Sequence, residues 1–358
     1  MNRGGAETFL MKIYRELDKT KFQMDFCVFT YEEGHYDKEI KQMGGKIYNL
    51  PMKTKNPIKS FNSIKKLVKK NGYDNVIRLS SSNISTIDLL ASKWGGAKNL
   101  ILRSTNTKSS NKITHKFINF VSCWMPRFIP TVKVAPSTEA GKYLFGKRAI
   151  KKNKVHILNN AIDTNQFYYD EDIRIKTRKE LNIENKFVVG HIGRFSQQKN
   201  HKFLIKVFNE IKKVNDNAIL MLIGKGELRD EVFKQVEEYN LEDDVLFLGI
   251  RDDVPQLLMA MDVMVFPSFY EGLPNVIVEA QGASLPCLIS SAITKEVKLT
   301  EFVMFNSLKN DAKDWANKAI ELYECTNRRN TKEDLINQGY DIKEMTEHFI
   351  SLTFNNDN

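Results

Sequence analysis

The chain has 358 residues, of which 42% are hydrophobic and 27% are charged, and this composition is typical of a globular protein with two domains. No run of about 18 apolar residues occurs and the first residues lack the pattern of a signal peptide, so neither a transmembrane helix nor secretion is expected. The four cysteines, Cys27, Cys123, Cys287 and Cys325, lie far apart and form no C-x-x-C pair. We therefore expect a reduced, cytoplasmic protein without disulfides.

The formal net charge of +10 is divided unevenly along the chain. Residues 1–158 carry 30 Lys and Arg side chains against 11 Asp and Glu, whereas residues 159–358 carry 24 against 33. A basic first half favours an anionic partner, either a membrane surface or a phosphorylated substrate, although lysines scattered over a solvated surface give the same count. No nucleic-acid-binding module is recognisable, so nucleic acid is not expected as a partner.

The chain begins with a glycine turn and not with a strand. Gly4 and Gly5 lead directly into a helical pattern whose apolar stripe includes Phe9, Ile13 and Leu17. In a doubly wound sheet, such a turn usually follows the first strand, and that strand is central. We therefore expect either that the start lies upstream or that the sheet lacks its middle strand, which would leave buried backbone groups unpaired.

Short apolar or β-branched runs then alternate with helical patterns along almost the whole chain. In the first half, the predicted strands are 22–29, 46–50, 74–79, 99–103, 132–135 and 154–158. In the second half, they are 186–192, 218–223, 245–248, 262–266 and 286–290. This alternation predicts an α/β fold with parallel strands and with helices on both faces of each sheet.

The two series of strands predict two doubly wound domains. A turn-rich segment without periodicity lies at 158–167, so we expect domains at 1–158 and 159–340. A final helical pattern follows Gly339, and we expect this helix, within 341–358, to fold back on the first domain.

A loop with two cations follows the first strand of the second half. The strand ends at Gly190–Gly193, and Arg194 and Lys199 come before the next helix. Arg offers a planar fork to phosphate and Lys a point charge, so the pair is a candidate clamp for a pyrophosphate. His191, at the strand end, is expected to be a packed histidine. The G-x-G at Gly224 and Gly226 is more typical of a tight turn than of a dinucleotide fingerprint.

The stretch FPSFYEGLPNVIVEAQG, residues 266–282, carries two carboxylates at Glu271 and Glu279. Pro274 suits the first turn of a helix, whose free backbone amides form an anion site at the carboxyl end of a strand. Glu279 lies among apolar residues of that helix, so we expect it to be buried and to need a partner. Sugar or ribose hydroxyls are good partners for a carboxylate, and a structural salt bridge to Lys or Arg is the alternative.

No metal site is predicted from the sequence. The six histidines form no H-x3-H or H-E-x-x-H pattern, and no D-x-D triplet occurs. We therefore expect no metal and no cofactor.

Taken together, these stretches resemble the retaining, family-4 glycosyltransferases of the GT-B fold, in which two Rossmann-like doubly wound domains face a cleft. The likeness is to bacterial exopolysaccharide and capsule enzymes, and it covers NRGGAE, NNAID, GHIGRFSQQKNH, LIGKGEL, VLFLG and the E-x7-E stretch at 271–279. Two features depart from the family pattern. The first strand is missing, and Thr105 in RSTNT stands where a histidine often lines the reaction centre.

The resemblance implies a role for each candidate residue. Arg194 and Lys199 would contact the donor diphosphate, and Glu271 would hold the hydroxyls of the donor sugar. Glu279 would bind the ribose. The remaining candidate substrate contacts are Gly4, Gly5, Gly193, Phe247, Leu248, Gly272, Leu273, Pro274 and Asn275, with Phe247 and Leu248 lining the nucleobase.

The implied reaction is the transfer, with retention, of a hexosyl or N-acetylhexosaminyl group from a nucleotide-diphospho donor, expected to be a UDP-sugar, in surface polysaccharide synthesis. The acceptor would be a glycan or a polyprenyl-pyrophosphate-linked oligosaccharide at the inner face of the plasma membrane. Two cations and a helix N-terminus would stabilise the diphosphate leaving group without a metal. The alternative is a truncated or inactive GT-B protein that binds a sugar nucleotide without turnover, and sugar-nucleotide epimerisation is a weaker one.

Overall fold

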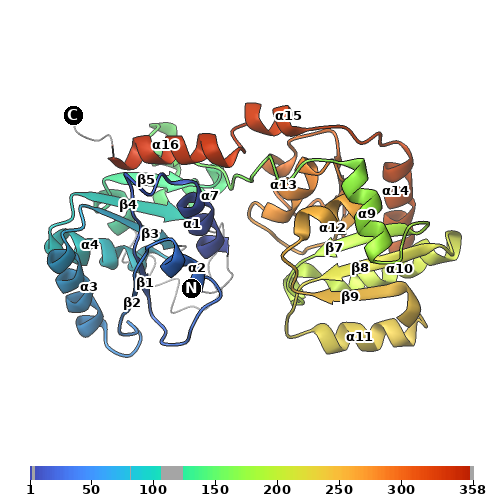
Figure 1. Ribbon diagram of the computed structural model, residues 1–358, viewed down its shortest axis with the longest axis horizontal. Helices are drawn as coiled ribbons and strands as arrows, with labels where there is room; N and C mark the ends of the chain where they lie inside the picture. Colours follow the sequence, from blue (N-terminus) through green and yellow to red (C-terminus); the bar gives the residue numbers. More distant parts are fainter. Residues whose placement is uncertain (2–4, 81, 106–123, 355–358) are drawn as a thin grey trace. The chain divides into compact units, whose positions relative to one another are not determined.

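The computed structural model describes residues 1, 5–80, 82–105 and 124–354, which form two compact units (Figure 1). Unit 1 comprises Met1–Asn160 and Ile342–Asn358, and unit 2 comprises Ala161–Asp341. None of the helices in these described ranges has both the length and the apolar character that a membrane span requires.

Unit 2 contains a six-stranded parallel sheet in the order β12-β11-β10-β7-β8-β9 (Figure 1). Its strands are β7 Phe187–Ile192, β8 Ala218–Ile223, β9 Val245–Gly249, β10 Val263–Phe266, β11 Cys287–Ser290 and β12 Val303–Asn306. Its α-helices are α9 Glu171–Glu180, α10 His201–Val214, α11 Arg229–Glu238, α12 Val254–Ala260, α13 Asn275–Gly282, α14 Ala312–Glu324 and α15 Lys332–Asn337. Short 3₁₀ turns lie at η2 Gln197–Lys199, η3 Glu242–Asp244 and η4 Lys295–Val297.

The core of unit 2 has two layers because successive strand residues point to opposite faces of the sheet. In β8, for example, Met221 packs in the layer that contains Ile277 of α13, whereas Leu222 packs in the layer that contains Phe208 of α10. Every residue of β8 is buried, as expected for an inner strand of a parallel sheet covered on both faces.

The strands of unit 1 form two separate parallel sheets. Strands β1 Phe26–Val28 and β2 Ile47–Asn49 pair with each other, and β3 Asn75–Ser80, β4 Asn99–Ser104, β5 Val132–Ala135 and β6 His156–Ile157 form a second parallel group. Among the described residues, β1 pairs with β2 and β3 pairs with β4, and no strand links the two groups.

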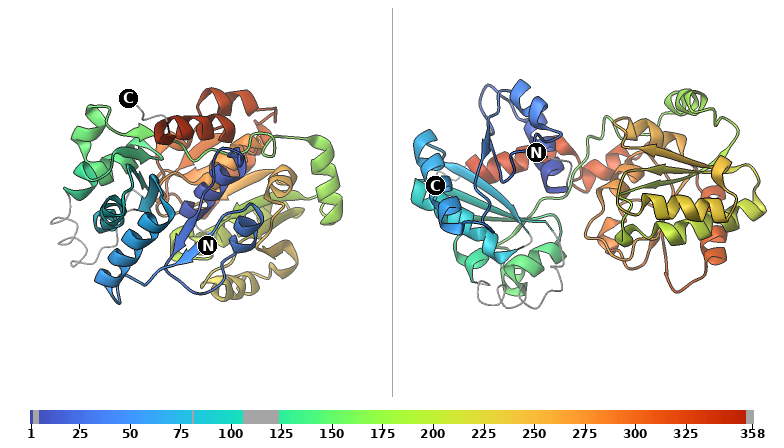
Figure 2. Two further views of the ribbon diagram at one scale, coloured as in Figure 1. Left: turned by 60° about the vertical axis from the view of Figure 1, so that its left-hand side comes forward. Right: turned by 90° about the horizontal axis from the view of Figure 1, so that it is seen from below.

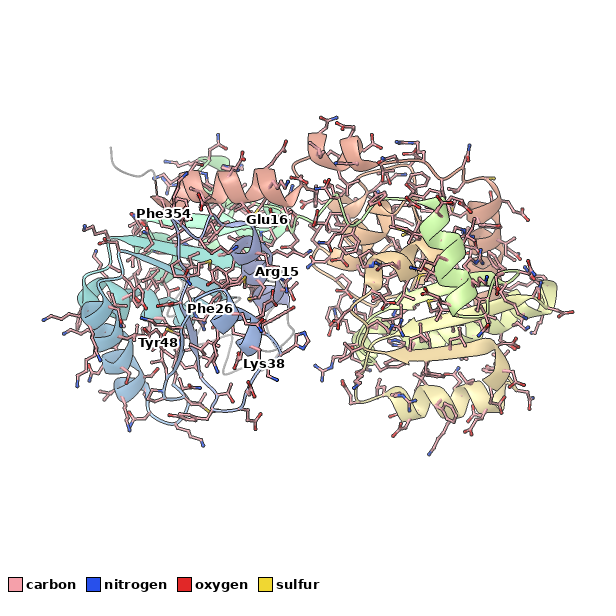
Figure 3. The ribbon with its side chains drawn as sticks, in the orientation of Figure 1. Arg15, Glu16, Phe26, Lys38, Tyr48 and Phe354 are labelled. Atoms are coloured by element: carbon pink, nitrogen blue, oxygen red, sulfur yellow. The ribbon has the colours of Figure 1, made fainter. Side chains whose placement is uncertain are left out.

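The helices of unit 1 cover these strands and include the last helix of the chain. They are α1 Gly5–Glu16, α2 Asp37–Gln42, α3 Pro57–Asn71, η1 Asn83–Thr86, α4 Ile87–Gly95, α6 Met125–Phe128, α7 Thr138–Phe145, α8 Lys147–Lys151 and α16 Ile342–Phe354. Helix α16 packs on α1, and the further views show the same neighbours (Figure 2). Figure 3 labels Phe354 near the end of α16. Its ring centroid lies 4.6 Å from that of Phe22, and Asn99 Nδ2 donates to Thr353 O over 3.3 Å.

The predicted fold class is confirmed, with differences at the edges of the sheets. Of the strand expected at 22–29, only Phe26–Val28 forms a strand, which pairs with β2. Strand β12, Val303–Asn306, was not predicted.

Candidate active site

Two loops at the carboxyl edge of the unit 2 sheet are tied together. One follows β7 and contains residues 193–200, and the other follows β10 and contains residues 267–274. Phe269 N donates to Gln198 O over 2.9 Å, and Gln198 Nε2 donates to Tyr270 O over 2.9 Å. Asn200 Nδ2 adds a bond of 3.2 Å to Pro267 O. These bonds hold the side chains of both loops in a fixed relation.

Lys199 and Glu271 meet across the two loops. Lys199 Nζ lies 2.8 Å from Glu271 Oε1, and their side chains are only 16% and 11% exposed. The contact is an ion pair without hydrogen-bond alignment, and the buried Glu271 Oε1 has no hydrogen-bond partner among the described residues. Lys199 Nζ also lies 4.4 Å from the centroid of the Phe266 ring.

The absence of a side chain at Gly193 leaves room for the aliphatic part of the Lys199 side chain. A Cβ at this position would lie 3.1 Å from Lys199 Cε and 3.2 Å from His191 Nε2. A larger residue would therefore displace Lys199, so the structure brings three predicted residues, Gly193, Lys199 and Glu271, to one place.

Arg194 does not converge on the same point in this structure. Its guanidinium pairs with Glu227 Oε2 at 3.0 Å, and the two side chains are 72% and 55% exposed. A backbone amide hydrogen bond and the Arg194 cation hold the pKa of Glu227 below its usual range. Glu227 was not predicted from the sequence, although its position directly after the G-x-G turn could have indicated that it lies near the site.

Two glycines after β8 allow the loops to approach each other closely. Gly224 has φ +141°, and a Cβ there would lie 2.1 Å from Gly193 O. A Cβ at Gly226 would lie 2.3 Å from Phe195 O. Gly224 N donates to Gly249 O over 2.7 Å, which ties in the end of β9. The G-x-G is therefore a close backbone contact that supports the loop of Arg194 and Lys199.

Helix α13 presents an N-terminus that no side chain caps. Its N-cap is Pro274, and Leu273 and Asn275 beside it are partly exposed. A Cβ placed on Gly272 would meet no heavy atom within 4 Å, so the loop is open there. Among the described residues, the buried oxygens Asn275 Oδ1 and Ser268 Oγ have no hydrogen-bond partner. Free helix amides next to unpaired polar oxygens suit an anionic, hydroxyl-bearing ligand.

Glu279 is partly exposed, so the expectation that it is buried was wrong. Helix α13 turns only one side to the core, and Glu279 shares the other side with Val276, which is also partly exposed. The buried polar residue of α13 is Gln281, which was not predicted. Its Nε2 donates to Ile277 O, and its Oε1 accepts from Thr300 N over 3.0 Å, so its role is structural.

Phe247 and Leu248 lie at an irregular end of β9. The pairing with β8 shifts so that Ile223 faces Gly249, which leaves Leu248 as an extra residue. Phe247 is partly exposed, with its ring centroid 6.0 Å from that of Phe195.

Two buried histidines lie beneath the Lys199 loop. His191 Nδ1 lies 2.9 Å from Val265 O, and the ring centroids of His191 and His201 are 4.6 Å apart. Burial and then the Lys199 charge lower the pKa of His201 to about 4, and burial and His201 hold the pKa of His191 well below its usual value. Both rings are therefore neutral at pH 7, as expected for packed histidines.

The candidates in unit 1 lie at the start of α1 and at the end of β4. Gly5 is exposed and begins α1, and Gly4 lies outside the described residues. Thr105 follows β4 and is partly exposed. Nearby Arg103 was missed. It is buried, its guanidinium lies 3.5 Å from the Phe9 ring centroid, and it donates to Asn160 Oδ1 over 2.6 Å.

The described residues contain no group of three or more His, Cys, Asp and Glu side chains arranged to hold a metal ion. The site in unit 2 therefore consists of a lysine–glutamate pair, an exposed arginine and an open helix N-terminus.

Comparisons with known proteins show which family and fold the chain is similar to. The family model described as Glycosyl transferases group 1 matches residues 173–341. The chain is 32% identical over 351 residues to the putative glycosyltransferase EpsF of Bacillus subtilis (strain 168), which covers 96% of this chain and 91% of the relative. It is 27% identical over 241 residues to the UDP-Gal:alpha-D-GlcNAc-diphosphoundecaprenol alpha-1,3-galactosyltransferase of Escherichia coli, which covers 65% and 62%.

A solved structure shares the fold over nearly the whole chain. The crystal structure of Anabaena HepE in complex with UDP has a TM-score of 0.78 and 19% sequence identity, and it covers 97% of this chain and 95% of that one. Two Rossmann-like units, the matching family model and the near full-length relative lead to one conclusion: this chain is a GT-B glycosyltransferase and belongs to the Glycosyl transferases group 1 family.

Proposed function

We propose that the chain transfers a hexosyl or N-acetylhexosaminyl group, with retention, from a UDP-sugar to a lipid-linked or glycan acceptor in surface polysaccharide synthesis. The observation that carries this proposal is the Lys199–Glu271 pair, which is held at 2.8 Å beside the uncapped N-terminus of α13. A cation for phosphate and a carboxylate for sugar hydroxyls stand next to each other there, as a nucleotide-diphospho sugar requires.

The bound donor would separate Lys199 from Glu271 and give each side chain a new partner. Its diphosphate takes Lys199 Nζ and the amides at the start of α13, while its sugar hydroxyls donate to Glu271. Arg194, which is exposed and paired with Glu227, reorients toward the diphosphate when the donor binds. These groups stabilise the negative charge that grows on the leaving diphosphate, and fixed charges of this kind supply much of the rate enhancement in such reactions.

Retention needs no separate protein base in this scheme. The acceptor hydroxyl attacks from the face that the diphosphate leaves, and the departing phosphate oxygen takes the hydroxyl proton. His191 and His201, the histidines near Lys199, are 0% and 3% exposed and so do not reach an acceptor. The proposal includes no metal, because the lysine, the arginine and the helix amides supply the positive charge.

The relatives support the kinds of substrate. The Escherichia coli relative is named for a UDP-galactose donor and a diphosphoundecaprenol-linked acceptor, and HepE was crystallised with UDP. A Staphylococcus aureus relative, 28% identical over 304 residues, is named for capsular polysaccharide biosynthesis. These names favour transfer over a binding protein without turnover.

We further propose that unit 1 approaches an anionic membrane surface on the cytoplasmic side. Helix α3 ends in basic residues, and next to it Trp94 is 60% exposed, with Lys65 Nζ 5.8 Å from its ring centroid. Ile58 at the start of α3 is 74% exposed. Lysines next to an exposed tryptophan suit a lipid headgroup region.

The test is a transfer assay with purified protein. Thermal shifts with a panel of nucleotide sugars identify the donor, because a ligand that binds only the folded state raises the Tm. The radiolabelled donor is then incubated with an undecaprenyl-diphosphate-linked sugar, and the anomeric configuration of the product is read by NMR. We expect transfer with retention in the wild type and its loss in Lys199→Ala and Glu271→Ala.

Lys202→Ala is the matched control, since Lys202 lies three residues from Lys199 in an exposed pair with Glu231. Full transfer by both site variants would overturn the assignment of the site. Donor binding with neither transfer nor hydrolysis would overturn the proposal of an enzyme, and an inverted product would overturn retention.

A further inference from the structure

The loop between β10 and α13 exposes two adjacent aromatic side chains. Within residues 267–274, only Phe269 and Tyr270 are exposed, by 47% and 51%. The other residues of this loop are buried or partly buried, and Glu271 is one of them. A single exposed apolar residue is ordinary in a folded protein, whereas rings grouped beside a binding site indicate contact with a ligand. We call Phe269 and Tyr270 the aromatic pair.

The backbone of the aromatic pair is held by Gln198 on the neighbouring loop. Phe269 N donates to Gln198 O and Gln198 Nε2 donates to Tyr270 O, both over 2.9 Å. These bonds use main-chain atoms of Phe269 and Tyr270, so they do not depend on either ring. Because the backbone beneath the rings is already fixed, a ligand that contacts them has less conformational entropy to overcome.

The aromatic pair lies at the sugar end of the proposed donor site. Glu271, which would hold the donor sugar, is the next residue in the chain, and its side chain is only 11% exposed. A sugar bound to this carboxylate therefore lies deeper in the site than the exposed rings. A second substrate that enters from solvent after the donor meets the rings at the rim of the site.

The strand order of the sheet separates the aromatic pair from the nucleobase position. Phe247, which would line the nucleobase, belongs to β9, whereas the aromatic pair follows β10. Strands β7 and β8 lie between them, so the two positions are about 14 Å apart at about 4.8 Å per strand. Along this edge, the base, the diphosphate at Lys199 and the sugar at Glu271 would follow one another, and the aromatic pair adjoins the sugar.

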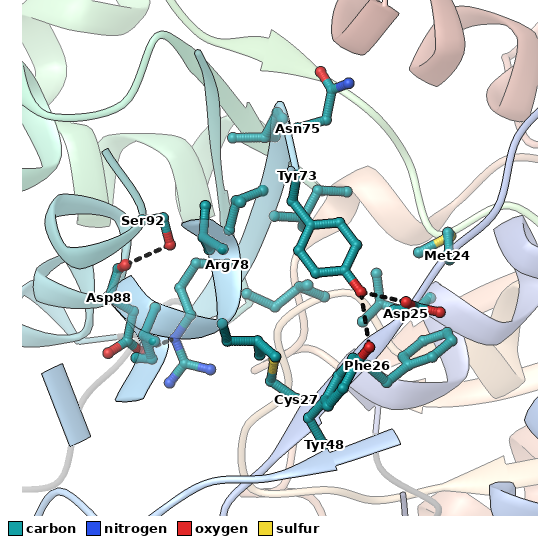
Figure 4. Close-up of a pocket in the computed structure, with 18 of the residues that line it drawn as sticks. Met24, Asp25, Phe26, Cys27, Tyr48, Tyr73, Asn75, Arg78, Asp88 and Ser92 are labelled. Atoms are coloured by element: carbon teal, nitrogen blue, oxygen red, sulfur yellow. Dashed lines mark hydrogen bonds and ion pairs between the residues drawn. The ribbon is translucent and has the colours of Figure 1, made fainter. Parts of the chain in front are cut away.

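Two tyrosines of unit 1 show how aromatic residues with a structural role differ from this pair. Figure 4 shows Tyr48 and Tyr73 with their hydroxyl groups directed toward each other, 3.3 Å apart, and Tyr73 also donates to Asp25. Both residues are partly buried. Packing and hydrogen bonds of this kind are the usual environment of a tyrosine inside a fold, whereas Phe269 and Tyr270 present about half of their surface to solvent.

We propose that Phe269 and Tyr270 bind a pyranose ring of the acceptor, the saccharide that receives the transferred sugar. The C–H groups on one face of a pyranose form an apolar surface with a partial positive charge. The face of an aromatic ring is apolar and carries a partial negative charge, so the two surfaces are complementary. This inference rests on the proposed function, because it takes the donor sugar to lie at Glu271.

The probes are the methyl α- and β-glycosides of glucose, galactose, N-acetylglucosamine and N-acetylgalactosamine. Farnesyl phosphate is added as an isoprenoid probe that carries no sugar. Saturation-transfer NMR measures the Kd of each probe for the whole chain in the presence of saturating UDP, and calorimetric titration measures the Kd for UDP on the same samples. Tyr323→Ser is the matched control, because Tyr323 in α14 is 42% exposed and its ring lies 5.0 Å from that of Phe187, at the opposite end of β7 from the site.

We expect at least one methyl glycoside to bind the UDP-loaded chain, with a Kd that rises about tenfold in Phe269→Ser and in Tyr270→Ser. Phe269→Tyr and Tyr270→Phe keep the rings and should bind the glycoside as the wild type does. Glu271→Gln should also still bind it, since that residue would hold the donor sugar. The Kd for UDP should not change in the variants of the aromatic pair, because Lys199 and α13 are unaltered.

The proposal is overturned if no glycoside binds the wild type, if both serine variants bind as tightly as the wild type, or if only the binding of farnesyl phosphate responds to the substitutions. Glycoside binding that survives Phe269→Ser and Tyr270→Ser but is lost in Glu271→Gln would place the glycoside at the donor sugar position and would also overturn it. A chain that binds no UDP would contradict the proposed function instead, and glycoside titrations without UDP would still test the aromatic pair.

Discussion

Lys199 Nζ and Glu271 Oε1 lie 2.8 Å apart, on two loops that are hydrogen-bonded to each other at the carboxyl edge of one sheet. The two side chains are mostly buried, so each charge depends on the other in this structure. A bound donor would give Lys199 a phosphate and Glu271 sugar hydroxyls as new partners. Because both side chains are already mostly buried in the folded chain, donor binding adds little further cost of desolvating them.

We predict that Lys199→Ala lowers kcat by about 100- to 1,000-fold, which is the usual effect of removing one group that stabilises a developing anion. Glu271→Gln should keep part of the donor affinity, since an amide still bonds to sugar hydroxyls, but should lose most of kcat. Steady-state kinetics with a defined donor measure both effects, and urea unfolding separates them from lost stability. A Lys199→Ala enzyme with unchanged kcat at saturating donor would contradict the role of the lysine.

We predict that Arg194→Ala weakens donor binding and leaves stability within about 0.5 kcal/mol, because exposed ion pairs contribute little to folding. Glu227→Gln should bind the donor at least as well as wild type, since it releases Arg194 from its partner at 3.0 Å. Calorimetric titration with UDP gives the affinities. Equal weakening by both substitutions would indicate that the pair itself, and not the free arginine, holds the loop in place.

We predict that Gly224→Ala abolishes donor binding, because its Cβ would lie 2.1 Å from Gly193 O and would push the loop of Lys199 away. Gly249→Ala is the matched control, since Gly249 also has a positive φ of +67° but no heavy atom within 4 Å of a Cβ. The control should cost about 1–2 kcal/mol of stability for the left-handed backbone and should still bind UDP. Identical behaviour of the two variants would argue against the close contact as the cause.

We predict that the free energy of unfolding falls as the pH decreases from about 6.5 to about 4. The folded-state pKa of His201 is lowered to about 4, so the unfolded chain binds more protons over this range. The slope is about 1.4 kcal/mol per pH unit for each such histidine, and stability is fully present above the unfolded pKa. His201→Phe, which keeps the stacking on Phe195, should reduce the slope by one histidine in urea titrations at pH 7, 6 and 5. An unchanged slope would indicate that groups other than His201 cause the pH dependence of stability.

Much of the candidate site follows from local sequence. Lys199 and Glu271 each come just after a buried strand, and the carboxyl ends of parallel strands meet at one edge of a sheet. The glycine turn that opens α1 at Gly5 was also predictable from the sequence.

The sequence by itself determined the alternation of strands and helices, and with it the sheet edge that carries the cations and the helix N-terminus. Only the tertiary structure decided that Arg194 pairs with Glu227 and that Glu279 is partly exposed while Gln281 is buried. The physical reason is the distance along the sequence between the residues that interact. Periodicity reflects which side of one element faces the core, whereas a charge partner or a cavity depends on elements that are distant in the sequence and meet only when the chain packs.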